Sequence, residues 1–177
     1  MATWNSRGLR GSSLEDFINR TNDKYLEHHL GLVQKIPTPI TPVKIDKETR
    51  HITLAYFEQK STIDYIGVIQ GIPICFDAKE CASKTFTLNN IHAHQIDFMR
   101  EFELQKGIAF LIISFTAYQT YYYLPFRKLE EYIVRYKNGG KKNFHYEELD
   151  PKFILTSKQG ILIPYLDALQ LDLKERG

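Results

Sequence analysis

The chain has 177 residues, of which 43% are hydrophobic, and its formal net charge is +2 at pH 7. Length and apolar content predict one domain with a buried core and exclude a low-complexity protein, while the near-balanced charge means that any basic surface is local. No apolar run has the length of a signal core or a membrane span, so we expect a cytoplasmic protein with no membrane partner.

Residues 1–177 are therefore expected to form a single domain. At its start, residues 1–11 carry Arg7 and Arg10 among glycine, serine and asparagine. This composition predicts a flexible basic arm, which either lies against phosphates or is an ordinary chain end.

The segment from Ser13 to a stop at Gly31 is predicted to be an amphipathic helix, because its apolar residues recur at helical spacing. Glu15 lies beside the apolar stripe. It either faces solvent as a first-turn residue favoured by the helix dipole or reaches a metal site. Arg20 on the same helix is a candidate DNA contact.

Residues 32–36 are expected to form a short strand. The prolines of P-T-P-I-T-P, at 37–42, exclude a helix and introduce an extended two-stranded projection that ends at residue 57. We call residues 37–57 the stalk. Its mixture of cations and aromatic rings suits phosphates and exposed bases, although a solvated hairpin would look the same. Its candidate DNA contacts are Lys44, Lys47, Arg50, Tyr56 and Phe57.

The most informative segment is S-T-I-D-Y-I-G-V-I-Q-G-I-P-I-C-F-D-A-K-E, residues 61–80. Two apolar, β-rich runs flank residues 70–71, Gln-Gly, which have the character of a two-residue hairpin turn. A turn centred there places Asp64 directly opposite Asp77. Lys79 then shares the face of Asp77, because side chains alternate along a strand.

Opposed side chains in a hairpin lie within about 5 Å, where two carboxylates repel unless a cation or a proton neutralises them. A hard divalent cation such as Mg²⁺ would polarise a phosphodiester there and lower the pKa of a water, with Lys79 adding positive charge. The alternative is that Asp64 caps a strand end and Asp77 pairs with Lys79 on a solvated face.

Cys75 and Cys81 have no zinc-binding spacing. We expect core thiols rather than a disulfide, which fits a reducing cytoplasm.

Residues 83–87 are predicted to form a loop carrying Lys84, a further candidate DNA contact. Asn89 or Asn90 is placed to cap a second helix. Gln95 falls in the apolar stripe of that helix, and a buried amide needs a partner. This partner is either an active-site group, a substrate phosphate or nearby backbone.

In the last third of the chain, residues 108–115 form a continuous apolar run that predicts a fully buried strand, with 119–124 as its neighbour. A helix is expected over 125–136. The run K-N-G-G-K-K at 137–142 is a basic loop that either contacts a DNA backbone or is only solvated. Residues 161–173 combine a short strand with a final helix.

Six motifs give the chain a resemblance to the RecU family of bacterial Holliday junction resolvases, within the restriction-endonuclease-like superfamily. They are L-E-D-F-I-N-R-T-N (14–22), K-I-P-T-P (35–39), A-Y-F (55–57), S-T-I-D-Y (61–65), F-D-A-K-E (76–80) and H-A-H-Q-I-D-F-M (92–99). The resemblance covers nearly the whole chain. It implies an α/β fold with a mixed central sheet flanked by helices, and a projecting β stalk that enters the centre of a junction.

The resemblance also implies a homodimer that binds four-way junction DNA and makes paired, Mg²⁺-dependent nicks in recombination and repair, with Mn²⁺ as a substitute. Further partners implied are a RecA-type recombinase or a branch-migration helicase, although the N-terminal arm is short for such contacts.

The ligand set comes from the same resemblance: the metal would be held by Glu15, Asp64, Asp77 and the carbonyl of Ala78. Lys79 would orient the attacking water. The implied catalytic residues are Glu15, Thr62, Asp64, Asp77, Lys79 and Gln95. The family usually has glutamate where this chain has Asp77, one methylene shorter, which leaves the metal distances open.

Two other functions compete with junction resolution. One is a non-cleaving module that binds or bends junctions or modulates a recombinase, which would gain nothing from repelling carboxylates beside phosphate. The other is a nuclease for a different substrate, such as a restriction or replication-fork enzyme; the stalk favours junctions.

Overall fold

The computed structural model describes residues 13–57 and 63–176. The predicted N-terminal arm, with Arg7 and Arg10, and the candidate Thr62 lie outside the described residues. The strands are β1 (Gly31–Lys35), β2 (Ile40–Ile45), β3 (Ile52–Phe57), β4 (Tyr65–Ile69), β5 (Ile72–Cys81), β6 (Thr85–Thr87), β7 (Ile108–Phe115), β8 (Thr120–Pro125), β9 (Asn143–His145) and β10 (Ile154–Leu155). The α-helices are α1 (Ser13–Glu27), α2 (Ala93–Leu104), α3 (Phe126–Lys137) and α4 (Tyr165–Glu175), and short 3₁₀ turns cover Leu88–Asn90, Thr116–Tyr118, Tyr146–Glu148 and Pro151–Phe153.

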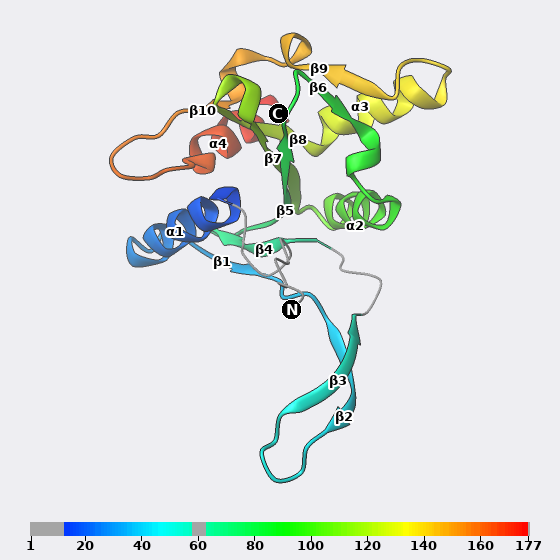
Figure 1. The fold of residues 1–177 in the computed structure, drawn as a ribbon. Helices are drawn as coiled ribbons and strands as arrows, with labels where there is room; N and C mark the ends of the chain where they lie inside the picture. The colour runs from blue at the N-terminus through cyan, green and yellow to red at the C-terminus, as the bar shows by residue number, and fades with distance from the viewer. Residues whose placement is uncertain (1–12, 58–62, 177) are drawn as a thin grey trace.

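The centre of the molecule is a six-stranded sheet in the order β1-β4-β5-β7-β8-β10 (Figure 1). β5 and β7 run parallel, while the other neighbouring pairs are antiparallel. The mixed central sheet predicted from the sequence is therefore confirmed.

Helices cover both faces of this sheet, as predicted (Figure 1). α1 and α4 meet on one face, where the rings of Tyr25 and Tyr165 pack edge to face at 5.1 Å. α2 and α3 meet on the other, joined by Arg100 Nε and Glu130 Oε1 at 2.8 Å. No helix among the described residues is long and apolar enough to cross a membrane.

An aromatic stack runs through the sheet from β4 to β8. Tyr65 stacks on Phe76 and Phe76 on Phe110, both with 4.7 Å between ring centroids, and Phe110 stacks on Tyr123 at 4.3 Å. All four rings are fully buried. Burial of each such side chain stabilises the fold by about 1.5–3 kcal/mol, so the stack holds β5 rigidly in the core.

β2 and β3 form a separate two-stranded sheet that projects from the body (Figure 1). This is the stalk predicted from the sequence. Asp46 closes its tip by accepting hydrogen bonds from the N–H groups of Glu48 and Thr49, both at 2.9 Å. Pro42 is tolerated inside β2 because the strand has only one neighbour and its register is irregular beyond that residue.

Two element boundaries differ from prediction. The first helix ends at Glu27 rather than Gly31, because His29 takes a left-handed backbone (φ 54°) and the N–H of Leu30 donates to the carbonyl of Tyr25 at 2.8 Å. β5 continues beyond the apolar run at residues 72–76 that predicts it, as far as Cys81, because β7 pairs alongside it over that length.

Three further predictions were wrong. The segment 83–87 is not only a loop, because β6 pairs with β9. Neither Asn89 nor Asn90 caps α2, since both belong to the preceding 3₁₀ turn and His92 is the capping residue. The last short strand is β10, whereas residues 161–164 contribute one isolated bridge.

Candidate active site

The β4–β5 hairpin has the predicted register, with Tyr65 opposite Phe76 and Ile69 opposite Ile72. Gln70 (φ 49°) and Gly71 (φ 85°) are both left-handed, as a type I′ turn requires. The hairpin prediction is thus confirmed, and its open end carries the candidate carboxylates.

Asp64 and Asp77 are brought together at that end. The N–H of Asp64 donates to Oδ1 of Asp77 at 3.0 Å, and the N–H of Ala78 donates to Oδ2 of Asp64 at 3.0 Å. Each carboxylate is therefore oriented by the backbone of the opposite segment. Such reciprocal main-chain bonds give the pair a fixed geometry.

Lys79 neutralises Asp77 inside the protein rather than on a solvated face. Its Nζ lies 2.5 Å from Oδ2 of Asp77, whose side chain is 0% exposed against 17% for Lys79. The ion pair lacks hydrogen-bond geometry, so Oδ2 of Asp77 is buried without a hydrogen-bond donor. In this structure Oδ2 of Asp77 therefore has the Lys79 ammonium as its cation, and a hard divalent cation at this oxygen would have to displace that ammonium.

The environment of Asp64 favours its protonated form. Burial is the largest cause, and the neighbouring carboxylate of Asp77 adds to it, so the pKa of Asp64 rises to about 6. The N–H of Ala78 and the ammonium of Lys79 oppose this shift but do not cancel it. Above that pH the two carboxylates repel each other, and a divalent cation would relieve the repulsion.

Gln95 is buried, and its amide contacts two of the kinds of partner expected from the sequence, an active-site group and nearby backbone. Its Oε1 accepts hydrogen bonds from the N–H of His92 at 3.1 Å and from Nζ of Lys79 at 3.3 Å. The amide therefore joins the start of α2 to the lysine of the site. His92 was not among the predicted site residues, although its three-residue spacing from Gln95 is that of a capping box.

Glu15, on α1, forms an ion pair with β1 in this structure. Its Oε2 is 2.7 Å from Nζ of Lys35, which pairs across β1–β4 with Tyr65. Burial, followed by the charges of Glu15 and Asp64, raises the pKa of Tyr65. Lys35 was not predicted, although it opens the motif K-I-P-T-P.

A metal centre made of protein side chains alone is absent from the described residues, since no three His, Cys, Asp or Glu side chains cluster there. The paired carboxylates with the undonated oxygen nevertheless fit a hard divalent cation, which uses one or two carboxylates and takes its other oxygens from water and substrate phosphate. The metal-binding roles of Glu15 and of the Ala78 carbonyl stay predictions.

The candidate DNA contacts lie on the stalk and on the surface of the body. On the stalk, Lys44, Lys47 and Arg50 are exposed, as are Tyr56 (57%) and Phe57 (72%). Elsewhere two further cations are exposed, Arg20 on α1 and Lys84, whose Nζ lies 5.6 Å from the centroid of the Tyr118 ring.

The two cysteines are free and buried, as predicted. Burial is the main cause that raises the pKa of the Cys75 thiol. The thiol of Cys81 donates to the carbonyls of Ser83 and Thr85. Both act as core residues rather than nucleophiles.

The fold and the site together define a mixed α/β protein with a paired-carboxylate centre on its central hairpin. Within this class, the chain belongs to the family described as "RecU: Recombination protein U", whose model matches residues 9–171.

Relatives of the chain carry the name Holliday junction resolvase RecU. The protein from Leuconostoc mesenteroides subsp. mesenteroides is 44% identical over 168 residues, 92% of this chain and 81% of the relative. Those from Oenococcus oeni and Bacillus cereus are 42% and 43% identical over 92% and 84% of this chain, and 83% and 76% of the relatives. Among solved structures, the Holliday junction resolvase Hjc of Archaeoglobus fulgidus is 6% identical, with a TM-score of 0.41 over 64% of this chain and 77% of that one. This last likeness is weak, and the family assignment rests on the sequence.

Proposed function

We propose that this protein is a structure-specific endonuclease that resolves Holliday junctions by paired hydrolysis of phosphodiester bonds in recombination and repair. Membership of the family and the names of its relatives support this activity. The observation that carries it is the pair Asp64 and Asp77, held opposite each other by reciprocal main-chain hydrogen bonds, with the ammonium of Lys79 on Oδ2 of Asp77. A module that only binds DNA would lose affinity by holding two carboxylates next to phosphate.

The cofactor of this proposal is Mg²⁺, with Mn²⁺ as a substitute, held by Asp64, Asp77, Glu15 and the carbonyl of Ala78. When bound, the cation would polarise the scissile phosphodiester and lower the pKa of a water. Glu15 would have to exchange its ion pair with Lys35 for this role.

Lys79 holds positive charge beside the scissile phosphate. Asp77 and Gln95 position its ammonium, so the charge is preorganised and does not have to be recruited during the reaction. Gln95 thereby acts as a positioning residue, and Thr62, which lies outside the described residues, is kept as a supporting residue from the family resemblance.

We also propose that two chains act together as a homodimer, since paired nicks need two sites and the described residues hold one paired-carboxylate site. The stalk of each chain would enter the junction, and contacts elsewhere would be mainly to phosphates. A RecA-type recombinase or a branch-migration helicase is a further partner. Two free thiols and a DNA substrate fit the cytoplasm.

The test is cleavage of a synthetic mobile four-way junction beside a linear duplex of the same sequence, with and without Mg²⁺. Wild type is compared with Asp77→Asn, and with Asp23→Asn as a matched control on the exposed surface of α1. We expect symmetrical nicks on the junction alone, at least about 100-fold slower in Asp77→Asn and unchanged in the control.

Tight junction binding without nicks in Mg²⁺ or Mn²⁺ would refute the enzyme and leave a binding module. Equal cleavage of linear duplex would refute junction specificity and leave a nuclease for another substrate.

A further inference from the structure

The turn between α3 and β9, residues 137–142, presents three lysines in a fixed shape; we call it the basic turn. The N–H of Gly140 returns to the carbonyl of Arg135 at 2.9 Å, and a Cβ at Gly140 would meet that oxygen at 2.7 Å. Gly139 is left-handed, with φ 85°. The turn is therefore tight, and its exposed lysines are Lys137, Lys141 and Lys142.

The positive charge of the basic turn is not compensated locally. Within residues 13–57 and 63–176, none of its three lysines takes part in an ion pair. The carboxylates of the neighbouring elements already have partners: Glu148 pairs with Arg135 at 2.6 Å, and Glu131 pairs with Lys128 at 2.5 Å. A surface with three ammonium groups outside ion pairs, and with paired acids around it, attracts a polyanion.

A continuous path of contacts connects the basic turn to the candidate active site. The N–H of Leu88 donates to the carbonyl of Lys142 at 3.1 Å. Leu88 begins the 3₁₀ turn that leads to His92, whose N–H donates to Gln95, which in turn accepts from Lys79. The basic turn and Lys79 thus lie at the two ends of one short segment, residues 88–92.

Asn89, Asn90 and His92 of that segment are exposed, Leu88 and Ile91 are buried, and the segment contains no carboxylate. In Figure 1 the turn between α3 and β9 lies at the opposite end of the molecule from the stalk, β2–β3. A duplex lying over the segment would therefore leave the site in the direction away from the stalk.

We propose that the basic turn binds the phosphate backbone of a duplex arm as that arm leaves the cleavage site, while the stalk contacts the centre of the junction. This inference rests on the proposed function and adds a second DNA-contact surface to it. Because phosphate contacts carry no sequence or branch information, the turn strengthens binding to junction and linear duplex alike.

The experiment removes the three charges together as Lys137→Gln, Lys141→Gln and Lys142→Gln. A control of equal charge carries Lys24→Gln, Lys106→Gln and Lys174→Gln, lysines with no ion pair among the described residues. Dissociation constants for the junction and for linear duplex are measured in EDTA over a range of salt concentrations, so that cleavage plays no part. Thermal unfolding shows that all variants are folded.

We expect the basic-turn variant to bind both substrates at least tenfold more weakly than wild type. The slope of log K against log salt should fall by about 2–3, because each phosphate that the protein no longer neutralises lowers it by about 0.9. The control should stay within about threefold of wild type.

A basic-turn variant that loses no more affinity or salt dependence than the control would overturn the inference. Failure of the proposed function looks different: wild type would then bind duplex without preferring or cleaving the junction, whereas the comparison of the two triple variants on duplex would still report on the turn.

Discussion

At the residue scale, the charge balance of the site depends on Lys79. Its ammonium is the only cation paired with Asp77 among the described residues, and Asp77 has no exposed surface. A buried carboxylate that loses its partner keeps the cost of desolvation without the compensating attraction. Stability and chemistry are therefore coupled at this lysine.

For Lys79→Gln we expect the metal-free protein to lose about 3 kcal/mol of unfolding free energy, because Asp77 is left buried and unpaired. Denaturant melts in EDTA measure this loss. The double variant Asp77→Asn, Lys79→Gln should recover most of the lost unfolding free energy, because the negative charge of Asp77 is then removed as well. Losses that simply add in the double variant would contradict the coupling.

Glu148 makes the stability of the fold depend on pH in the acid range. Hydrogen bonds from Arg135, first, and from the N–H of His145 lower the pKa of Glu148 below its ordinary value. Because the folded pKa is the lower one, the stabilisation is present above the unfolded value near 4.5 and is lost as pH falls through the folded value.

The variant Glu148→Gln should therefore be less stable than wild type at neutral pH, by about 0.5–1 kcal/mol for a partly exposed pair. Near pH 3 the two proteins should converge. Urea melts at a series of pH values test this, with Glu101→Gln, an exposed residue of α2, as the control. A constant difference across the series would show that the ion pair is not the cause.

At the element scale, the stalk is a hairpin that makes its own hydrogen bonds and has no sheet behind it. Large apolar side chains along both strands are exposed: Val43, Ile45, Ile52, Leu54, Tyr56 and Phe57. An isolated two-stranded ribbon is marginally stable in water, so contacts with DNA or a second chain would reinforce it. Its removal should not disturb the body.

A variant in which Pro42–Ala55 is replaced by Asn-Gly joins the paired residues Thr41 and Tyr56 through a two-residue turn. We expect it to keep the thermal unfolding temperature of the body within a few degrees and to lose its preference for four-way junctions over duplex. Competition binding with both substrates measures the preference. A shortened protein that still selects junctions would show that the stalk is not what recognises them.

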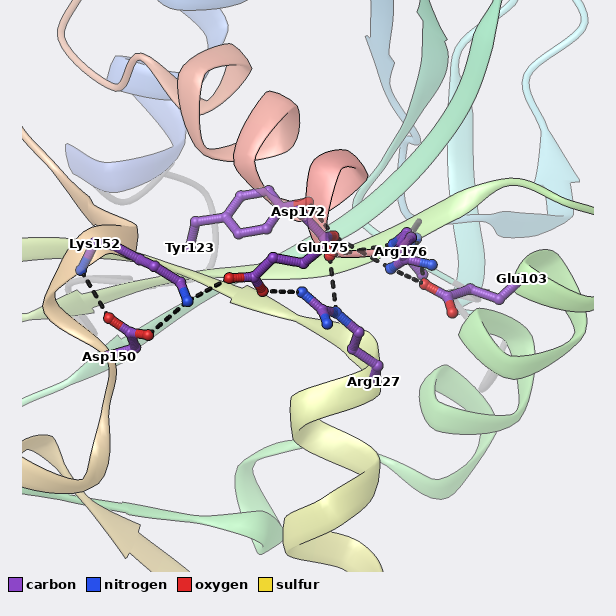
Figure 2. A network of polar contacts seen from close by, with 9 residues as sticks. Glu103, Tyr123, Arg127, Asp150, Lys152, Asp172, Glu175 and Arg176 are labelled. Carbon is purple, nitrogen blue, oxygen red and sulfur yellow. Dashed lines mark hydrogen bonds and ion pairs between the residues drawn. The ribbon is translucent and has the colours of Figure 1, made fainter.

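At the scale of the whole molecule, one buried carboxylate ties the last helix to β8 and α3 directly and to α2 through Arg176 (Figure 2). Asp172 on α4 accepts from the hydroxyl of Tyr123 and from Nε of Arg127, both at 3.0 Å, and from Arg176 at 3.1 Å. Arg176 continues to Glu103 on α2 at 2.8 Å. The C-terminal helix thus locks together the two faces of the sheet.

Loss of this acceptor in Asp172→Ala should destabilise the protein by about 3 kcal/mol, since the buried hydroxyl of Tyr123 loses its acceptor and Arg127 and Arg176 each lose one of two carboxylate partners. For a chain of this length the unfolding temperature should fall by roughly 6–12 °C. Junction cleavage at a temperature where the variant is folded should be unchanged, because the hydrogen bonds and ion pairs of Asp172 go to Tyr123, Arg127 and Arg176 and not to the candidate site. A selective loss of cleavage would assign it a catalytic role.

The sequence by itself determined the central hairpin and the stalk. The turn at Gln70-Gly71 and the alternation of side chains along each strand are local properties, so they place Asp64 beside Asp77 without knowledge of the rest of the fold. Only the tertiary structure decided what surrounds that pair. The extension of β5 alongside β7, the pairing of β6 with β9 and the ion pair of Glu15 with Lys35 join segments far apart in sequence. Such contacts are selected by packing among many side chains, and no local period of hydrophobic residues encodes them.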